Sequence, residues 1–257
     1  MPRNCRIIWL RCSVPEAIRQ GIRALWIDVD NTLLDFQKCA DECAEKCFAD
    51  WNLEWKPSYS KTFHSINNGL WKQIERRELD LEGLKQIRWN LILGSLGIHG
   101  VDGVEFEMRF RHYLNSSHVP VAGALEALEK LQKQYTLFVI SNGPSWQQIN
   151  RLSLAGMDGF FRGIFTSEEL QVSKPDPRFF QRALQMSQEI LPDLEKDEIL
   201  VIGDSLSADI QGALNAGFRP VWFDLDPLDK SVENTVPVPV FHDWQSLCGV
   251  LLDQKTA

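Results

Sequence analysis

No apolar run in this sequence of 257 residues approaches the length of a membrane-spanning helix. Near its start, Arg6 and Arg11 flank the short apolar patch at residues 7–10, so this patch does not match a secretory signal either. We therefore expect a cytoplasmic protein with no membrane partner. Because thiols stay reduced in the cytoplasm, the six cysteines are expected to be free rather than paired.

The chain also lacks an excess of positive charge. It carries 27 Lys and Arg against 35 Asp and Glu, which gives a formal net charge of -8. Proteins that bind nucleic-acid polymers or anionic membranes generally present a basic face, so both partners are disfavoured. A small anionic substrate stays compatible with this balance, because a bound metal ion reverses the local field.

Internal repeats and low-complexity tracts are absent too, so hydrophobic periodicity is the guide to how the chain is organised. Hydrophobic residues make up 44% of the sequence, which is ample for a packed core. Between residues 36 and 118 every periodic segment has helical spacing. We predict helices at residues 37–51, 59–77, 80–96 and 104–115.

The pattern changes at residue 119, after which buried strands alternate with helices. Besides a first strand at 24–27, strands are expected at 135–140, 163–165, 199–202, 220–223 and 238–241. The intervening helices are expected at 123–133, 145–154, 177–186, 208–216 and 244–252. Apolar strands separated by helices are typical of a parallel sheet that is covered on both faces. The predicted fold class is therefore α/β, with a Rossmann-like, doubly wound parallel sheet core at 1–35 and 119–257 and an all-helical domain inserted at 36–118.

The most informative segment is Asp28-Val29-Asp30-Asn31-Thr32, which directly follows the first strand. Two carboxylates thus stand two positions apart where a buried strand ends, and burying like charges together is costly unless a cation or a shared proton relieves them. Hard oxygen ligands suit magnesium. The pair therefore suggests a metal site with a nucleophile beside it. The alternative is a polar turn in which Asp30 and Thr32 compete to cap the next helix.

Polar residues also follow the next two strands. Ser141-Asn142-Gly143 offers a hydroxyl, an amide and backbone donors that could bind a phosphate. Lys174-Pro175 offers a cation for an oxyanion, on a backbone that the proline restrains. Taken alone, the first segment is equally a turn, and the lysine is equally a solvated surface residue.

A second acidic pair, Asp204 and Asp209, lies in the segment after the strand at 199–202. Asp209 opens the next predicted helix, where it would cap that helix or support the metal ligands; a helix-capping loop is the simpler alternative. In parallel sheets of this kind, ligands bind beyond the carboxyl ends of the strands. Because all four polar segments occur there, we expect them to converge on one site.

The order of the four motifs resembles the haloacid dehalogenase superfamily of phosphatases. These motifs are Asp-x-Asp-x-Thr at 28–32, Ser-Asn-Gly at 141–143, Lys-Pro at 174–175 and Gly-Asp-x-x-x-x-Asp at 203–209. The resemblance extends over nearly the whole chain beyond Arg23, and the block at 36–118 resembles the superfamily's helical cap domain. Residues 66–71 and 209–217 are similar to the branch that contains pyrimidine 5'-nucleotidases; the second segment is also similar to sialic-acid-phosphate phosphatases.

The resemblance implies roles for three acids. Asp28 would be the nucleophile that forms an aspartyl-phosphate. Asp30 would protonate the leaving oxygen and later accept a proton from water. Magnesium is expected on the carboxylates of Asp28 and Asp204 and on the backbone carbonyl of Asp30. A hydrolytic dehalogenase has no alkoxide to protonate, so the second acid favours phosphate esters.

The resemblance also implies a phosphate-binding set. Ser141, the backbone N–H groups near Asn142 and the side chain of Lys174 would bind the transferring oxygens, and Lys174 would take part in catalysis. The implied activity is Mg²⁺-dependent hydrolysis of a small phosphorylated metabolite, with pyrimidine nucleoside 5'-monophosphates favoured. The alternatives are a phosphatase for sugar phosphates or phosphoglycolate and, in another class, a noncatalytic module that binds a phosphometabolite.

Two further groups lie in the helical block. Trp71 would stack on a base that Asn67 and Asn68 read, with Arg76 on the same helix; the alternative is that Trp71 packs inside the cap. Three cysteines spaced by four residues share one helix face, at positions 39, 43 and 47. They span too great a length to bind one zinc ion, so we expect them to pack as small apolar residues.

Overall fold

The computed structural model describes residues 18–225 and 237–252. The apolar patch near the start of the chain, and two of the six cysteines, lie outside the described residues. The described chain divides into two compact units: residues 36–119 form one, and the segments before and after them form the other. No helix within the described ranges is both long and apolar enough to cross a membrane.

One parallel sheet organises the unit built from the two outer segments. Its strand order is β3-β2-β1-β4-β5-β6, and every neighbouring pair runs parallel. The strands are β1 (Ala24–Ile27), β2 (Thr136–Ser141), β3 (Gly163–Thr166), β4 (Ile199–Gly203), β5 (Arg219–Phe223) and β6 (Val240–Phe241). The order reverses at β1, which lies between β2 and β4. The doubly wound α/β prediction is therefore confirmed, and the reversal places the ligand-binding edge beside β1.

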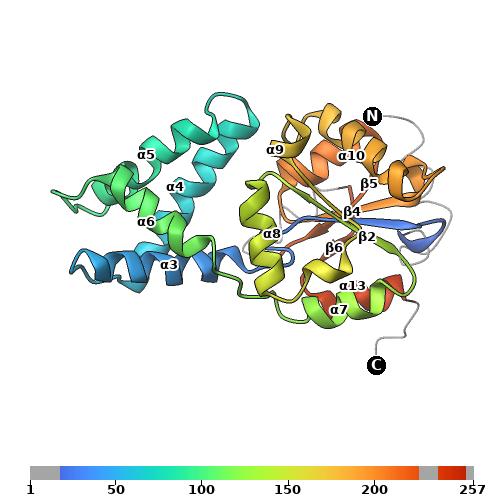
Figure 1. Ribbon diagram of the computed structural model, residues 1–257, viewed down its shortest axis with the longest axis horizontal. Coiled ribbons are helices and arrows are strands. Elements are labelled where there is room, and N and C mark those ends of the chain that lie inside the picture. The colour runs from blue at the N-terminus through green and yellow to red at the C-terminus, as the bar shows by residue number, and fades with distance from the viewer. Residues whose placement is uncertain (1–17, 226–236, 253–257) are drawn as a thin grey trace. The chain divides into compact units, whose positions relative to one another are not determined.

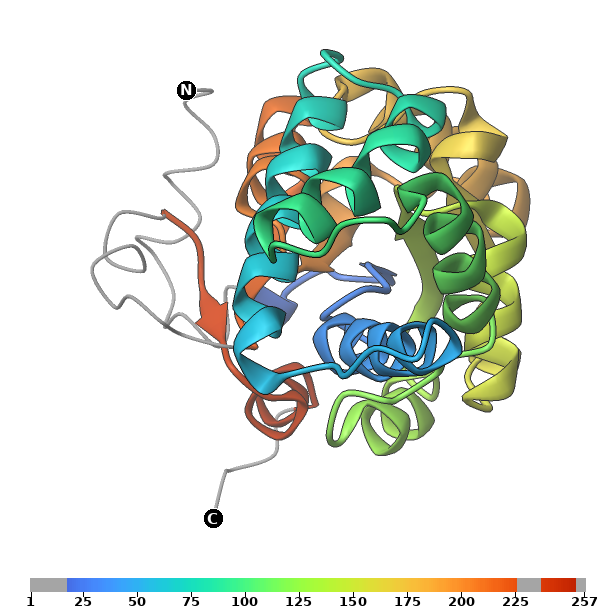
Figure 2. The ribbon, with the colours of Figure 1, turned by 90° about the vertical axis from the view of Figure 1, so that its left-hand side faces the viewer.

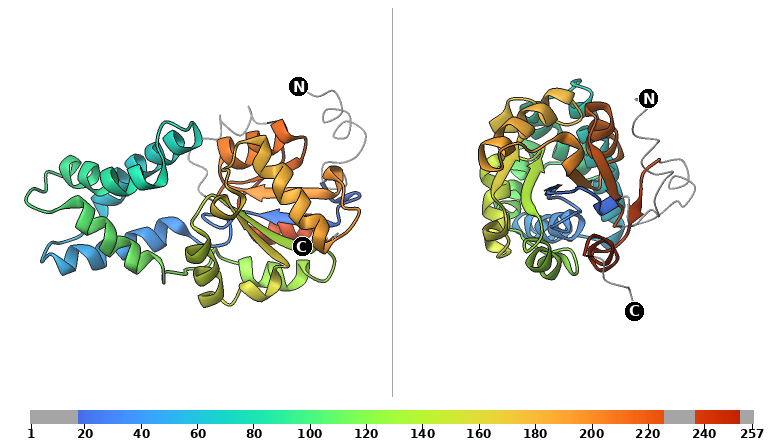
Figure 3. Two further views of the ribbon diagram at one scale, coloured as in Figure 1. Left: turned by 45° about the horizontal axis from the view of Figure 1, so that its top comes forward. Right: turned by 90° about the vertical axis from the view of Figure 1, so that its right-hand side faces the viewer.

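Helices cover both faces of this sheet (Figures 1 and 3). The side chains of β1 alternate between two apolar clusters: Leu25 and Ile27 lie in one, and Trp26 lies in the other. The first cluster includes α7 (Ala124–Leu131), α8 (Ser145–Leu154) and α13 (Trp244–Leu251). The second includes α9 (Ser167–Leu170), α10 (Pro177–Ile190) and α11 (Gly212–Ala216). Burial on both faces explains why the strands read as continuous apolar runs.

The unit at residues 36–119 is helical, and its helices run from blue to green in Figures 1 and 2. They are α3 (Phe36–Asp50), α4 (Pro57–Glu75), α5 (Leu81–Ser95) and α6 (Gly103–Leu114). The side chains of Asp80 and Asp102 cap α5 and α6. Cys39, Cys43 and Cys47 are buried in the apolar core of this unit, as their expected packing role requires.

The segment after β4 differs from its prediction. Instead of one α-helix at 208–216, a π-helix at Leu206–Gln211 precedes α11. Of the two roles expected for Asp209, the helix cap belongs instead to Ser205, whose Oγ accepts from the Ala208 backbone N–H at 3.1 Å. Asp209 lies inside this π-helix, and its Oδ2 accepts from the Ser205 backbone N–H at 3.1 Å. The four-residue α9 and the short 3-10 helices at Asp158–Phe160 and Lys196–Glu198 were not predicted.

Candidate active site

The polar motifs meet beyond the carboxyl ends of β1, β2 and β4. Asp28 directly follows β1, and its backbone N–H donates to the Ile202 carbonyl of β4 at 2.9 Å. After it the chain turns tightly, because the Val29 carbonyl accepts from the N–H groups of both Leu33 and Leu34 at 2.9 Å. This turn holds Asp28 and Asp30 at the edge of the sheet.

Lys174 joins two of the acids. Its Nζ lies 2.6 Å from Asp28 Oδ1 and 2.6 Å from Asp209 Oδ1, and it also donates to the Ile140 carbonyl at 3.2 Å. The lysine is 1% exposed, and Asp28 and Asp209 are buried with it. Burial lowers the pKa of Lys174, but Asp209 and Asp28 outweigh burial and hold this pKa above its ordinary value. The lysine is therefore a charged, fixed group rather than a solvated surface residue.

The side chain of Asn142 holds the segment that carries Lys174. Its Nδ2 donates to the Lys174 carbonyl at 2.9 Å, and its Oδ1 accepts from the Lys174 backbone N–H at 2.9 Å. The hydroxyl of Ser167 donates to the Asn142 carbonyl at 3.0 Å. Asn142 thus links the motif after β2 with the motif after β3.

Three carboxylates gather in one place. Asp28, Asp204 and Asp209 can each present one oxygen within 4.8 Å of the others. Gly203 allows this approach, since a Cβ at that position would lie 2.4 Å from the Asp209 Cγ. Of the predicted metal ligands, the structure therefore brings together Asp28 and Asp204, and it adds Asp209 to them.

The electrostatics of this cluster favour a cation. Burial raises the pKa of Asp28 well above its ordinary value; Lys174 opposes the shift, and Asp209 and Asp204 add to it. Burial and the neighbouring Asp209 also raise the pKa of Asp204 to about 7, although a hydrogen bond from Asn31 lowers it. A divalent ion would supply the missing positive charge, and an all-oxygen donor set suits Mg²⁺. The residues present therefore fit a magnesium ion.

Asp30 is held from α8. Arg151 Nη1 lies 2.7 Å from its Oδ1, and Gln148 Nε2 donates to its Oδ2 at 2.8 Å. Gln148 Nε2 also lies 3.1 Å from the Oγ of Ser141, which in turn accepts from the Gly143 N–H at 3.0 Å. Ser141 and Asp30, which belong to separate motifs, are therefore joined through one glutamine.

The sequence motifs do not include Arg151 and Gln148. A signal for them existed, because both lie on the face of α8 that carries the buried Leu152. Polar residues on the face of a helix that packs against a sheet need partners there.

Three of the residues of the helical unit that were suggested to read a base are engaged in contacts within that unit. Asn67 is 1% exposed, and its Oδ1 accepts from Arg88 Nη1 at 3.0 Å inside this unit. Trp71 is partly buried against a small apolar cluster of Leu70, Ile74 and Leu84. Arg76 pairs with Glu78 at the surface, at 2.8 Å. The structure thus favours the packing alternative for Trp71, and it engages Asn67 in the interior.

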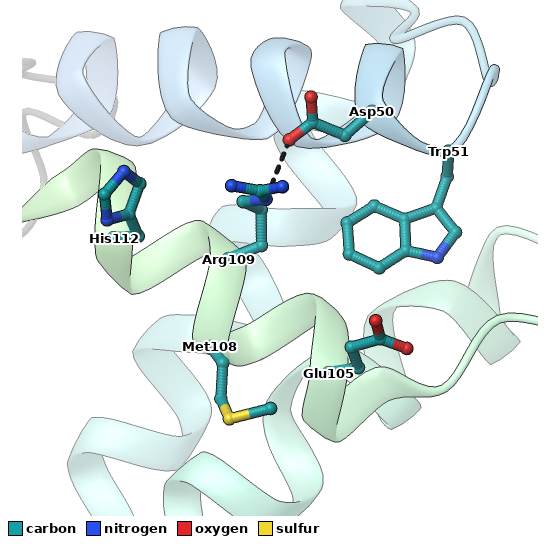
Figure 4. A pocket seen from close by; sticks show the side chains of 6 residues that line it. All are labelled: Asp50, Trp51, Glu105, Met108, Arg109 and His112. Carbon is teal, nitrogen blue, oxygen red and sulfur yellow. Dashed lines mark ion pairs between the residues drawn. The ribbon is translucent and has the colours of Figure 1, made fainter.

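The helical unit also contains a groove of about 490 Å³, between the end of α3 and one face of α6 (Figure 4). Arg109 Nε lies 3.0 Å from Asp50 Oδ2 across it. None of the motif residues lines this groove, whose walls are formed by Asp50, Trp51, Glu105, Met108, Arg109 and His112. The candidate active site is therefore the cluster beyond the carboxyl ends of the strands, where the motif residues lie.

Comparison with known proteins identifies the family of this chain. Residues 22–217 match the family model of the haloacid dehalogenase-like hydrolases, a span that contains all four motifs. YfnB of Bacillus subtilis, which is named as a HAD-hydrolase, is 30% identical over 234 residues, or 91% of this chain and 97% of YfnB. A crystal structure of YfnB with bound magnesium superposes with a TM-score of 0.80 and covers 90% of this chain and 98% of that chain.

Two relatives are named for their substrates. The pyrimidine 5'-nucleotidase PynA of Streptococcus pneumoniae is 29% identical over 228 residues, which is 88% of this chain and 94% of PynA. The glyceraldehyde 3-phosphate phosphatase of Pyrococcus furiosus is 28% identical over 219 residues, which is 79% of this chain and 80% of that enzyme. Both relatives act on small phosphorylated molecules.

Proposed function

The chain belongs to the haloacid dehalogenase-like hydrolases, and from this premise we propose that it is a Mg²⁺-dependent phosphomonoesterase that acts through an aspartyl-phosphate. The observation that carries the proposal is the pairing of a buried carboxylate, Asp28, with a second carboxylate, Asp30, beside a cluster suited to a metal ion. The favoured substrates are pyrimidine nucleoside 5'-monophosphates.

In the first half-reaction, the Asp28 carboxylate attacks phosphorus. A bond forms between its oxygen and phosphorus while the bond from phosphorus to the ester oxygen breaks. Asp30 donates its proton to that oxygen, so the product leaves as a neutral alcohol. Asp30 is left as a carboxylate, and Asp28 carries the phosphoryl group.

In the second half-reaction, a water molecule attacks the phosphorus of the aspartyl-phosphate. The Asp30 carboxylate accepts a proton from this water, the new oxygen–phosphorus bond forms, and the bond to Asp28 breaks. Inorganic phosphate leaves, and both acids return to their starting states. One residue that acts first as acid and then as base closes the cycle without another proton carrier.

The remaining motif residues would stabilise the negative charge of the phosphoryl group. The Ser141 hydroxyl, the backbone N–H groups near Asn142 and the Lys174 ammonium bind the phosphoryl oxygens, and losing one such donor typically costs on the order of a hundredfold in turnover. Mg²⁺ on the Asp28 and Asp204 carboxylates and the Asp30 carbonyl would offset the repulsion between an anionic nucleophile and an anionic phosphate. Asp209 would keep Lys174 in place from the other side. Residues 36–118 would act as the cap domain that selects the substrate.

A panel assay of phosphate release tests the substrate class. The panel holds uridine, cytidine and adenosine 5'-monophosphates, glyceraldehyde 3-phosphate and phosphoglycolate, each with Mg²⁺ and with excess chelator. We expect the pyrimidine nucleotides to be hydrolysed fastest and only with Mg²⁺. The similarity to the Pyrococcus furiosus enzyme favours sugar phosphates as the second candidate; if these exceed every nucleotide by orders of magnitude, the nucleotidase assignment is lost.

Replacing the nucleophile separates an enzyme from a noncatalytic binding module. Asp28→Asn keeps the shape of the side chain but removes the attacking anion. Turnover should fall by on the order of a thousandfold or more, while the variant still folds and binds nucleotide. Hydrolysis at the normal rate in this variant would refute Asp28 as the nucleophile.

A further inference from the structure

We propose that Arg151 and Gln148 are positioning residues, which hold the Asp30 carboxylate in the one orientation that allows it to serve as acid and base. The inference rests on the proposed phosphatase reaction, in which Asp30 moves protons. It adds two residues of α8 that lie outside the four sequence motifs.

The first support is that both oxygens of Asp30 are bound from the same helix. Arg151 donates to Oδ1 at 2.7 Å and Gln148 donates to Oδ2 at 2.8 Å. Residues three apart share one face of a helix, so the two donors form a rigid pair. Two contacts at different oxygens fix the rotation of the carboxyl group as well as its position.

The second support is the burial of Arg151. Its side chain is 0% exposed, whereas the side chain of Asp30 is 32% exposed. A guanidinium removed from water is costly unless it is paired and hydrogen-bonded, and an apolar residue would serve simple packing against the sheet better. The charge of Arg151 is directed at the partly exposed carboxylate at the site.

The third support is the link that Gln148 makes to the phosphate-binding hydroxyl. The same Nε2 group contacts Asp30 Oδ2 and Ser141 Oγ, and Gln148 Oε1 accepts from Arg151 Nη1 at 3.3 Å. Proton donor and phosphate ligand are thus held at a fixed spacing. An ionised carboxylate has about four acceptor positions, so these two contacts leave room for the leaving oxygen or for water.

The test exploits leaving groups of different basicity. An alkyl phosphate needs its leaving oxygen protonated, whereas 4-nitrophenyl phosphate releases a stable anion without a proton. For Arg151→Met and Gln148→Leu with the best alkyl phosphate, we expect kcat to fall on the order of a hundredfold with little change in KM. The first turnover of 4-nitrophenyl phosphate should slow by less than about tenfold.

Later turnovers of the aryl ester should slow more, because hydrolysis of the aspartyl-phosphate still needs Asp30 as a base. The variants should therefore show a burst of nitrophenolate equal to the enzyme concentration, followed by a slow phase. Arg151→Lys, which keeps the charge, should recover part of the alkyl activity.

Arg219→Met is the matched control. Arg219 is also buried, but its guanidinium donates to backbone carbonyls such as those of Gln20 and Asp197 at 2.9 Å, away from Asp30. It should lower stability without any dependence on the leaving group. Equal losses in the first turnover of both esters in the α8 variants, or the same leaving-group dependence in Arg219→Met, would overturn the proposal.

A structural readout keeps the inference separate from the proposed function. Crystal structures of Arg151→Met and Gln148→Leu should show the Asp30 carboxyl rotated or disordered. An unchanged Asp30 would overturn the positioning role even if the enzyme is a phosphatase. An inactive wild-type enzyme in which these variants still displace Asp30 would instead refute the proposed reaction.

Discussion

Asn31 donates from its side-chain Nδ2 to Asp204 Oδ2 at 3.2 Å while its own backbone has a φ of 58°. The left-handed conformation closes the turn between Asp28 and Thr32, and asparagine is one of the few residues with a side chain that adopts it readily. One residue therefore both closes the turn after Asp28 and holds a candidate metal ligand that follows a different strand.

Asn31→Gly separates these two roles. Glycine accepts the left-handed backbone but cannot bind Asp204, so the fold should be kept while Mg²⁺ binding weakens by roughly 10-fold or more. Asn31→Ala loses the amide and also strains the turn, which should cost about 1 kcal/mol of stability. Calorimetric titration with Mg²⁺ and thermal unfolding check the pair; unchanged Mg²⁺ affinity in both variants would contradict the role of the amide.

Metal-free protein should become less stable as the pH rises. Burial, followed by the charge of Asp209, raises the pKa of Asp204 from 3.8 to about 7. Between these values the folded state holds a proton that the unfolded state has lost, so the free energy of unfolding falls as pH increases through this window. The contribution of Asp204 is fully present below 3.8 and is lost above about 7.

Bound Mg²⁺ should remove the pH dependence of the free energy of unfolding, because it stabilises the ionised carboxylates. It should also raise the Tm by mass action. Thermal unfolding at pH 5 and pH 8, in chelator and in excess Mg²⁺, provides the measurement. Asp204→Asn in chelator is the control and should flatten the curve. Metal-free protein that gains stability from pH 5 to pH 8 would contradict the prediction.

Gly143→Ala should disturb the site while sparing the fold. A Cβ at this position would lie 2.1 Å from Gln148 Nε2, so the added methyl should push the flexible end of Gln148 away from Asp30 and Ser141. Turnover should fall in the same leaving-group-dependent manner as in Gln148→Leu, with a small change in Tm. Gly159→Ala, where a Cβ meets nothing within 4 Å, is the matched control and should keep full activity.

The helical unit contains a buried ion pair whose loss should affect stability. Arg88 Nε and Nη2 donate to Glu107 at 2.9 and 2.7 Å, and the two side chains are 5% and 2% exposed. Glu107→Ala strands a buried guanidinium and should destabilise the protein by about 3 kcal/mol or more. Replacing both residues with methionine should recover most of that loss in thermal unfolding. A double variant as unstable as the single one would contradict this account.

The placement of the strands and of the four motifs is predictable from the sequence, because both depend on local patterns. Apolar runs mark strands that are buried on both faces, and the carboxyl ends of parallel strands share one edge. Residues as distant as Asp28 and Asp204 can therefore be assigned to one site from the sequence alone. The predicted helix at 145–154 matches α8 at both ends.

The remaining contacts depend on where side chains point in space. Polarity alone does not reveal that Arg151 reaches Asp30, because the direction of α8 across the sheet decides that contact. The wide turn at Leu206–Gln211 has no distinct periodicity, so the sequence predicts Asp209 at a helix start, as a cap or as a support for the metal ligands, and does not reveal its contact with Lys174. The sequence leaves Asn67 as a free amide because its partner Arg88 lies on another helix.

The central place of β1 has a consequence for synthesis on the ribosome. Its partners β2 and β4 begin only at Thr136 and Ile199, so this N-terminal strand emerges long before either neighbour exists. The helices at 36–119 close mostly local contacts and can form first. The apolar strand β1 therefore has no partner in the nascent chain until β2 has been translated, and it lacks its second neighbour until β4 follows, so one of its edges stays open to aggregation for most of synthesis.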